Sequence, residues 1–218
     1  MPSEISEQEK LILNVIEEYL NKNRYFDLSE ILPFIVSRFR MTSVDINIRR
    51  IEEILRGLVK KKLIVEGSKL IYKDILNNEK RKQIYNLIVE NPGIYFNKIL
   101  IESKISNHVA VWHLNILRKF NFIKKKKLDN HDVYFDSNFD IKKSRFAYIT
   151  SKKKSKEIID FLKKNDFGIT KTQLSKNLKI HPNTISKYLK LLEELSVVVK
   201  KKVSKRVIYF LNENFLSY

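Results

Sequence analysis

The sequence predicts an α+β fold that is mainly α, with small β-hairpins, organised as repeated small units. Three observations support this prediction. The 218 residues exceed what one small unit of about 60 to 100 residues needs to bury a core. A composition of 43% hydrophobic and 31% charged residues allows buried cores beneath an ionic surface. Finally, a shift of 75 residues aligns residues 84–135 with residues 159–210 without a gap.

The aligned positions are mostly apolar and helically spaced, as expected if one supersecondary unit occurs twice. They pair Ile84 with Ile159, Gly93 with Gly168, Ile105 with Ile180, Leu114 with Leu189, Leu117 with Leu192, the run Lys125–Lys127 with Lys200–Lys202, and Tyr134-Phe135 with Tyr209-Phe210.

Residues 1–74 show helical periods and then a short alternating stretch. We expect helices over 7–21, 28–39 and 44–62, and Asp27 before Leu28 is the firmest start signal among them. Leu63-Ile64-Val65 and Leu70-Ile71-Tyr72 flank Glu66-Gly67-Ser68, which predicts a short hairpin.

Residues 75–145 and 146–218 each predict three helices followed by a hairpin. In the first copy the helices span 78–90, 95–103 and about 106–120. The strands lie near 122–123 and 133–135, joined by the turn-type pair Asp129-Asn130. In the second copy the helices span about 153–164, 171–177 and 182–195, with strands near 197–202 and 206–211. Pro182 suits the first turn of its helix.

Three helices followed by a hairpin is the order of a winged helix, whose second and third helices form a helix-turn-helix. Asn91–Phe96, Ile105–Asn107 and Val111–Leu117 resemble winged-helix transcriptional regulators common in archaea and related to arsenic-repressor-like proteins. Ile180–Glu193 resembles the recognition helix of that family more closely. The resemblance covers about residues 76–212 and implies DNA binding. The expected architecture is therefore a tandem of two winged helices after a third, diverged one at 1–74.

Net charge favours a polyanionic partner. The chain carries +18 at neutral pH, divided as +1 over residues 1–74, +7 over 75–150 and +10 over 151–218. Such a field attracts double-stranded DNA. The alternative is that abundant Lys, Ile and Asn reflect an AT-rich genome, with many lysines only solvating the surface.

Several kinds of site and classes of protein are not expected from this sequence. With no cysteine and four scattered histidines, neither disulfides nor a metal site is predicted, and a cytoplasmic location fits. No apolar stretch approaches the roughly 20 residues that span a bilayer, so no membrane association is expected. No catalytic constellation or phosphate-cradling glycine loop is found, so neither an enzyme nor a cofactor is predicted.

The last unit carries the best candidate DNA-contacting set. If Ile185, Leu189 and Leu192 face the core, the opposite face of that helix holds side chains able to bond bases and phosphates: Asn183, Thr184, Ser186, Lys187 and Lys190. The hairpin adds Lys200, Lys201, Lys202, Lys205 and Arg206, which we expect on phosphates. A solvated polar face is the alternative for both sets.

The middle unit has an odder outward face. Candidate DNA contacts there are His108, Trp112 and Asn115 on the helix and Lys124, Lys125, Lys126 and Lys127 on the hairpin. Three roles are open for Trp112: contact with nucleic acid, a place in the core, or packing against a neighbouring domain. For His113, beside the core, a structural role is expected.

The N-terminal unit places Glu52 and Glu53 where the middle unit has Val111 and Trp112, and carboxylates there would repel phosphates. We therefore expect residues 1–74 to bind a protein partner or to form a homodimer. The predicted function is a DNA-binding transcriptional regulator. The alternative is a protein-interaction adaptor, because ESCRT-II-type trafficking subunits and polymerase-associated factors also use tandem winged helices.

Overall fold

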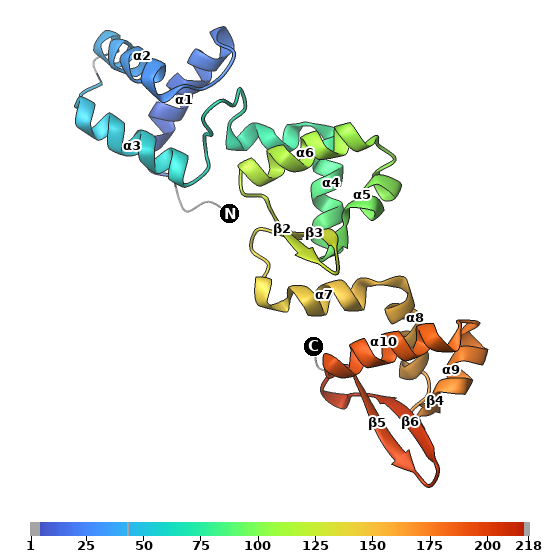
Figure 1. Ribbon diagram of the computed structural model, residues 1–218. Coiled ribbons are helices and arrows are strands. Elements are labelled where there is room, and N and C mark those ends of the chain that lie inside the picture. Colours follow the sequence, from blue (N-terminus) through green and yellow to red (C-terminus); the bar gives the residue numbers. More distant parts are fainter. Residues whose placement is uncertain (1–4, 43, 216–218) are drawn as a thin grey trace. The chain divides into compact units, whose positions relative to one another are not determined.

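The chain folds into helices and small antiparallel sheets, which agrees with the predicted α+β class (Figure 1). The computed structural model describes residues 5–42 and 44–215. It divides into two compact units, Met1–Val89 with Asn97–Lys125 and Glu90–Phe96 with Lys126–Tyr218. In the described part of the chain, no helix combines the length and apolarity that crossing a bilayer requires.

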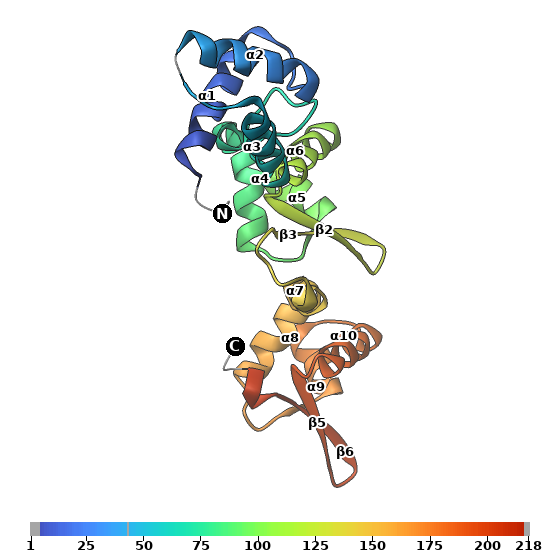
Figure 2. The ribbon, with the colours of Figure 1, turned by 90° about the vertical axis from the view of Figure 1, so that its left-hand side faces the viewer.

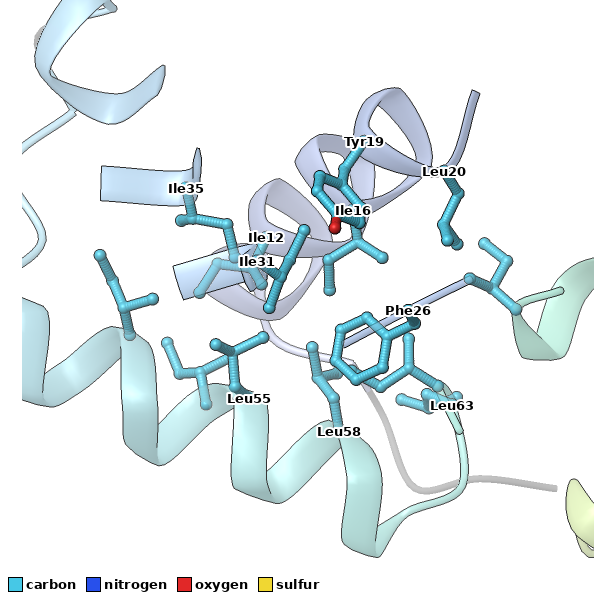
Figure 3. Close-up of a cluster of buried hydrophobic side chains, with 14 of the residues drawn as sticks. Ile12, Ile16, Tyr19, Leu20, Phe26, Ile31, Ile35, Leu55, Leu58 and Leu63 are labelled. Carbon is cyan, nitrogen blue, oxygen red and sulfur yellow. The ribbon is translucent and has the colours of Figure 1, made fainter. Parts of the chain in front are cut away.

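The first unit begins with three helices, α1 (Glu7–Lys22), α2 (Leu28–Met41) and α3 (Ile48–Lys60). Each starts at a side-chain cap that satisfies free backbone N–H groups: the caps are Ser6, Asp27 and Asn47. The three helices enclose one core (Figure 3), whose fully buried members include Ile12, Ile16, Ile31, Ile35, Leu55 and Leu58.

The hairpin predicted over residues 63–72 is wrong, since the structure has no strand in this described stretch. Its turn is bonded elsewhere: Phe26 N–H donates to the Ser68 carbonyl, and Gly67 N–H donates to the Phe26 carbonyl, both at 2.9 Å. Tyr72 N–H donates to the Leu63 carbonyl at 2.8 Å, and Tyr72 then begins the 3₁₀ helix η1 (Tyr72–Asn77). Because Phe26 takes the hydrogen bonds of the turn, the two segments do not form a ladder. The third helix also starts later than predicted, at Ile48.

One order of elements occurs twice along the rest of the chain. The first run is α4 (Glu79–Glu90), β1 (Ile94–Tyr95), α5 (Phe96–Ser103), α6 (Asn107–Lys119), β2 (Ile123–Leu128) and β3 (His131–Asp136). The second is α8 (Lys153–Lys163), β4 (Ile169–Thr170), α9 (Lys171–Leu178), α10 (Pro182–Glu194), β5 (Val198–Val203) and β6 (Arg206–Leu211). The sheet orders are β1-β3-β2 and β4-β6-β5. The two-residue strands β1 and β4 were not predicted.

A further helix, α7 (Ser144–Ser151), follows the short 3₁₀ helix η2 (Ile141–Lys143) in the second unit. Tyr148 and Ile149 of α7 are buried together with Val133 and Phe135 of β3, and the same cluster includes the core of the second run. The short 3₁₀ helix η3 (Glu213–Phe215) closes the described chain. The sequence pattern did not predict α7, which extends the core of residues 153–211 to β3.

Candidate nucleic-acid interface

The start of α10 is defined by two adjacent residues. His181 is the N-cap, and its Nδ1 accepts a hydrogen bond from the Asn183 N–H at 3.2 Å. Pro182 occupies the first turn, where its missing N–H costs nothing. The inward face is the predicted one, since Ile185, Leu189 and Leu192 of α10 are all buried. His181 was not among the residues that the sequence pattern indicated for this site.

The outer face of α10 is polar and basic toward its N-terminal end. Asn183, Lys187 and Lys190 are exposed, and Thr184 and Ser186 are half-buried. The Ser186 hydroxyl donates to the Pro182 carbonyl at 3.0 Å, so its proton is already in use. This leaves Asn183 and the two lysines as the most available donors of the predicted set.

The turn between α9 and α10 is held by local bonds. Lys179 adopts a left-handed conformation at φ 52°, and Ile180 next to it is buried. The Ser175 hydroxyl donates to the Ile180 carbonyl at 2.6 Å, and the Ile180 N–H donates to the Ser175 carbonyl at 3.1 Å. These contacts orient α10 relative to α9.

The hairpin of β5 and β6 extends away from the helices of its own unit (Figures 1 and 2). Lys202, Lys205 and Arg206 are exposed at its far end, beside Ser204 in a left-handed turn. The lysines nearer the helix differ: Lys200 donates to Glu193 of α10 at 2.8 Å, which raises the pKa of Lys200. Lys201 lies 5.3 Å from the ring centroid of Phe210. The five predicted cations therefore separate into an engaged pair and an available end group.

On α6 the predicted side chains His108, Trp112 and Asn115 are exposed, with 55% of Trp112 accessible. His113 is buried, and its Nδ1 has no hydrogen-bond partner among the described residues. Burial, followed by the charge of Arg81, lowers the pKa of His113. The burial of His113 agrees with the structural role expected for it. Because Trp112 is exposed, it does not belong to the core of its own unit.

The lysines of the hairpin β2–β3 are not equivalent. Lys124, Lys125 and Lys127 are exposed, but Lys126 donates to the Ser144 hydroxyl of α7 at 2.7 Å. The turn of that hairpin is engaged as well, because Asp129 pairs with Arg145 at 3.8 Å and with Lys152 at 3.3 Å. Contacts to α7 therefore hold this hairpin near its turn, unlike the end of β5–β6.

Helix α3 carries its charges as pairs along its own surface. Arg49 pairs with Glu53 at 3.7 Å, and Arg56 pairs with Glu52 at 3.9 Å. Exposed pairs of this kind contribute little stability, but they neutralise the arginines locally. The arginines of α3 are thus compensated by carboxylates of the same helix, and the exposed Lys60 at its end is the cation for which no such pair is found among the described residues. Nowhere in the described part of the chain do three or more potential metal-ligating side chains gather.

Two comparisons with known proteins bear on this site. Residues 154–209, which include α9, α10 and most of the β5–β6 hairpin, match the family described as HTH domain, where HTH denotes helix-turn-helix. The chain is 31% identical over 144 residues to an uncharacterized HTH-type transcriptional regulator of Methanocaldococcus jannaschii. The match covers 66% of this chain and 36% of that relative, so the chain spans little more than a third of the relative's length.

Proposed function

We propose that the chain is a DNA-binding transcriptional regulator built of tandem winged helices, with α10 in the major groove of duplex DNA. The observation that carries this proposal is the exposed face of α10, which presents Asn183, Lys187 and Lys190 without a carboxylate between them. The match of residues 154–209 to the HTH family and the similarity to an HTH-type regulator support it.

The chemistry of this face suits base and phosphate contacts. An asparagine amide can bond both N6 and N7 of adenine, and lysine can donate to guanine or to a phosphate. The Ser186 hydroxyl, whose proton goes to the Pro182 carbonyl, can still accept a hydrogen bond from a base amino group. The Thr184 hydroxyl can donate to a base or to a phosphate. The N-terminus of α10 adds the positive end of a helix dipole, which favours an adjacent phosphate.

In this proposal the end of the β5–β6 hairpin binds phosphates. Lys202, Lys205 and Arg206 are exposed, and no ion pair is found for them within the described residues. Lys200 and Lys201 contribute less because Glu193 and Phe210 already engage them. Lys124 and Lys127 add to the field that draws a polyanion toward the chain.

Residues 1–74 have a different role in this proposal, as a contact unit for a second copy or another protein. Their net charge is only +1, and the Arg–Glu pairs on α3 leave few cations for phosphates. An adaptor that binds only proteins is the alternative function, and it predicts no affinity for duplex DNA.

The intact chain is expected to bind duplex DNA with an affinity that falls steeply as salt increases. The variant Lys202→Gln/Lys205→Gln/Arg206→Gln should lower the slope of log affinity against log salt by about 2.7, because each phosphate that is no longer neutralised reduces the slope by about 0.9. Its sequence preference should be unchanged, because phosphate contacts carry no base information. Fluorescence anisotropy with a labelled duplex library at several salt concentrations measures both.

The control is Lys60→Gln/Lys62→Gln/Lys69→Gln, which removes the same charge from exposed positions of the first unit. It should bind with the parent slope. An equal fall in slope for the control and the hairpin variant would show that net charge alone drives binding. If the parent chain did not bind duplex DNA even at low salt, the regulator function would be rejected in favour of the adaptor function.

A further inference from the structure

The first unit contains an open groove of about 730 Å³ beside α6 and the beginning of β2. Pockets that bind small ligands commonly have volumes of about 300 to 1,000 Å³. The polar and aromatic groups along the groove are Trp112, Asn115, Arg118, Lys119, Lys124 and Lys125. Among the described residues that line it, none is acidic. The groove is therefore suited to an anion that also offers an aromatic face.

Trp112 is the only tryptophan of the chain and is supported from within the protein. The Arg81 guanidinium lies 5.3 Å from the Trp112 ring centroid, and the His113 ring meets it edge-on at 4.8 Å. Arg81 is only 2% exposed and does not line the groove, which places it on the protein side of the indole. One indole face is thus held against the protein while 55% of the side chain stays accessible.

Arg81 is a buried charge with little compensation. Its Nη1 donates to the Ile75 carbonyl at 2.8 Å, and its Nε has no hydrogen-bond partner among the described residues. Burial lowers the pKa of this guanidinium. An unpaired buried cation is costly, and an anion close by would offset part of that cost. The charge of Arg81 therefore adds to the attraction that the groove exerts on anions.

The other polar groups of the groove are an amide beside Trp112 and a set of cations around it. Asn115 lies three residues after Trp112, so both share one face of α6. Arg118, Lys119 and Lys124 have no carboxylate within ion-pair distance in the described structure and surround the same groove. A side-chain amide beside an indole can recognise the edge of a stacked base, while the cations bind a phosphate.

We propose that this groove binds a purine nucleotide, with the base stacked on Trp112, its edge on Asn115 and its phosphate on Arg118, Lys119 or Lys124. The nucleotide can be free in solution or belong to a single strand, because both present the same base and phosphate. This site is separate from the duplex contacts of α10 and does not rest on them.

The test uses the full chain and the fluorescence of its single tryptophan. Adenosine monophosphate should quench Trp112, because a stacked base lies directly on the emitting ring. Adenosine and inorganic phosphate, each with half of the recognised chemistry, should bind at least about tenfold more weakly. A short oligo-adenylate single strand is titrated in parallel. Tighter binding of the strand or of the mononucleotide identifies which source the site uses, and either supports the proposal.

Variants are measured by calorimetry, since changing Trp112 removes the reporter. Trp112→Ala should weaken binding of adenosine monophosphate by about tenfold or more, the usual effect of removing one base–aromatic stack, whereas Trp112→Phe retains most of it. Arg118→Glu/Lys124→Glu should abolish binding, and the matched control Lys60→Glu/Lys62→Glu should bind like the parent. Lys187→Glu/Lys190→Glu should also bind the nucleotide normally, which separates this site from the duplex interface.

Four results would overturn the proposal, three of them from the binding measurements. These three are no binding of either nucleotide probe, inorganic phosphate binding as tightly as adenosine monophosphate, and unchanged affinity in Trp112→Ala. Quenching that depends on protein concentration without any nucleotide would identify a second copy as the occupant and would overturn it as well.

Discussion

The variant Lys187→Glu/Lys190→Glu is expected to bind duplex DNA at least about a hundredfold more weakly, because two contacts worth about 1 to 3 kcal/mol each are replaced by repulsion. Both side chains are exposed on α10, while the buried stripe of that helix is untouched. Binding that remains should also discriminate less between sequences. Anisotropy titrations of a mixed duplex library, followed by sequencing of the bound fraction, measure affinity and preference together.

A matched control carries the same reversal elsewhere in the second unit. Lys163→Glu/Lys164→Glu changes two exposed lysines at the end of α8. It should weaken binding only through net charge, by less than the α10 variant, and should leave the sequence preference intact. If the two variants were weakened equally and kept the same preference, α10 would not be the base-contacting helix.

Apolar periodicity was enough to predict most of the helices and the two hairpins of the repeat. It works where local spacing and burial agree, as in α10, where Ile185, Leu189 and Leu192 lie on the buried face. Helix α7 was not predicted. Its buried residues Tyr148 and Ile149 pack on β3 and on the last repeat, and such contacts between distant segments leave no periodic pattern in the local sequence. Residues 63–72 look like a hairpin, yet Phe26 takes the hydrogen bonds of the turn.

The candidate site was predictable in its residue types but not in its pairings. Exposed Asn183, Lys187 and Lys190 follow directly from the spacing of the buried stripe. The bond from Lys200 to Glu193 joins β5 to α10, and the bond from Lys126 to Ser144 joins β2 to α7. Such pairs depend on how elements pack, so a lysine run alone cannot tell an available cation from an engaged one.

Arg81 shows the same limit for the groove on the first unit. In sequence it is one basic residue among three near the start of α4, with nothing to mark it as buried. Its place against Trp112 appears only once α4 and α6 are packed. Helical periodicity places Trp112 on the outer face, but it cannot find the cation behind the ring.

Gly93→Ala is expected to destabilise the second unit by about 3 kcal/mol, because two penalties add. Gly93 has φ 84°, a conformation that costs an alanine about 1 to 2 kcal/mol. A Cβ there would also lie 2.9 Å from the backbone N and Cα of Tyr148, which α7 cannot move without disturbing its buried side chain. Native-state hydrogen exchange, followed on peptides from β3 and α7, measures and locates the destabilisation.

Gly168 occupies the position that aligns with Gly93 in the repeat. It shares the positive φ, but the atoms nearest to an added Cβ belong to side chains, so comparing the two variants isolates the cost of the clash with the Tyr148 backbone. Its φ of 73° is similar, but the added Cβ would lie 2.4 to 2.6 Å from atoms of the Phe210 ring and the Ile208 side chain, whose rotation can relieve a clash that fixed backbone atoms cannot. Gly168→Ala should therefore cost less, about 1 to 2 kcal/mol. Gly57→Ala, with open space around it in α3, should instead raise the stability of the first unit by about 0.5 to 1 kcal/mol. Equal destabilisation at Gly93 and Gly168 would mean that the approach of the α7 backbone to Gly93 costs no more than the side-chain contacts at Gly168.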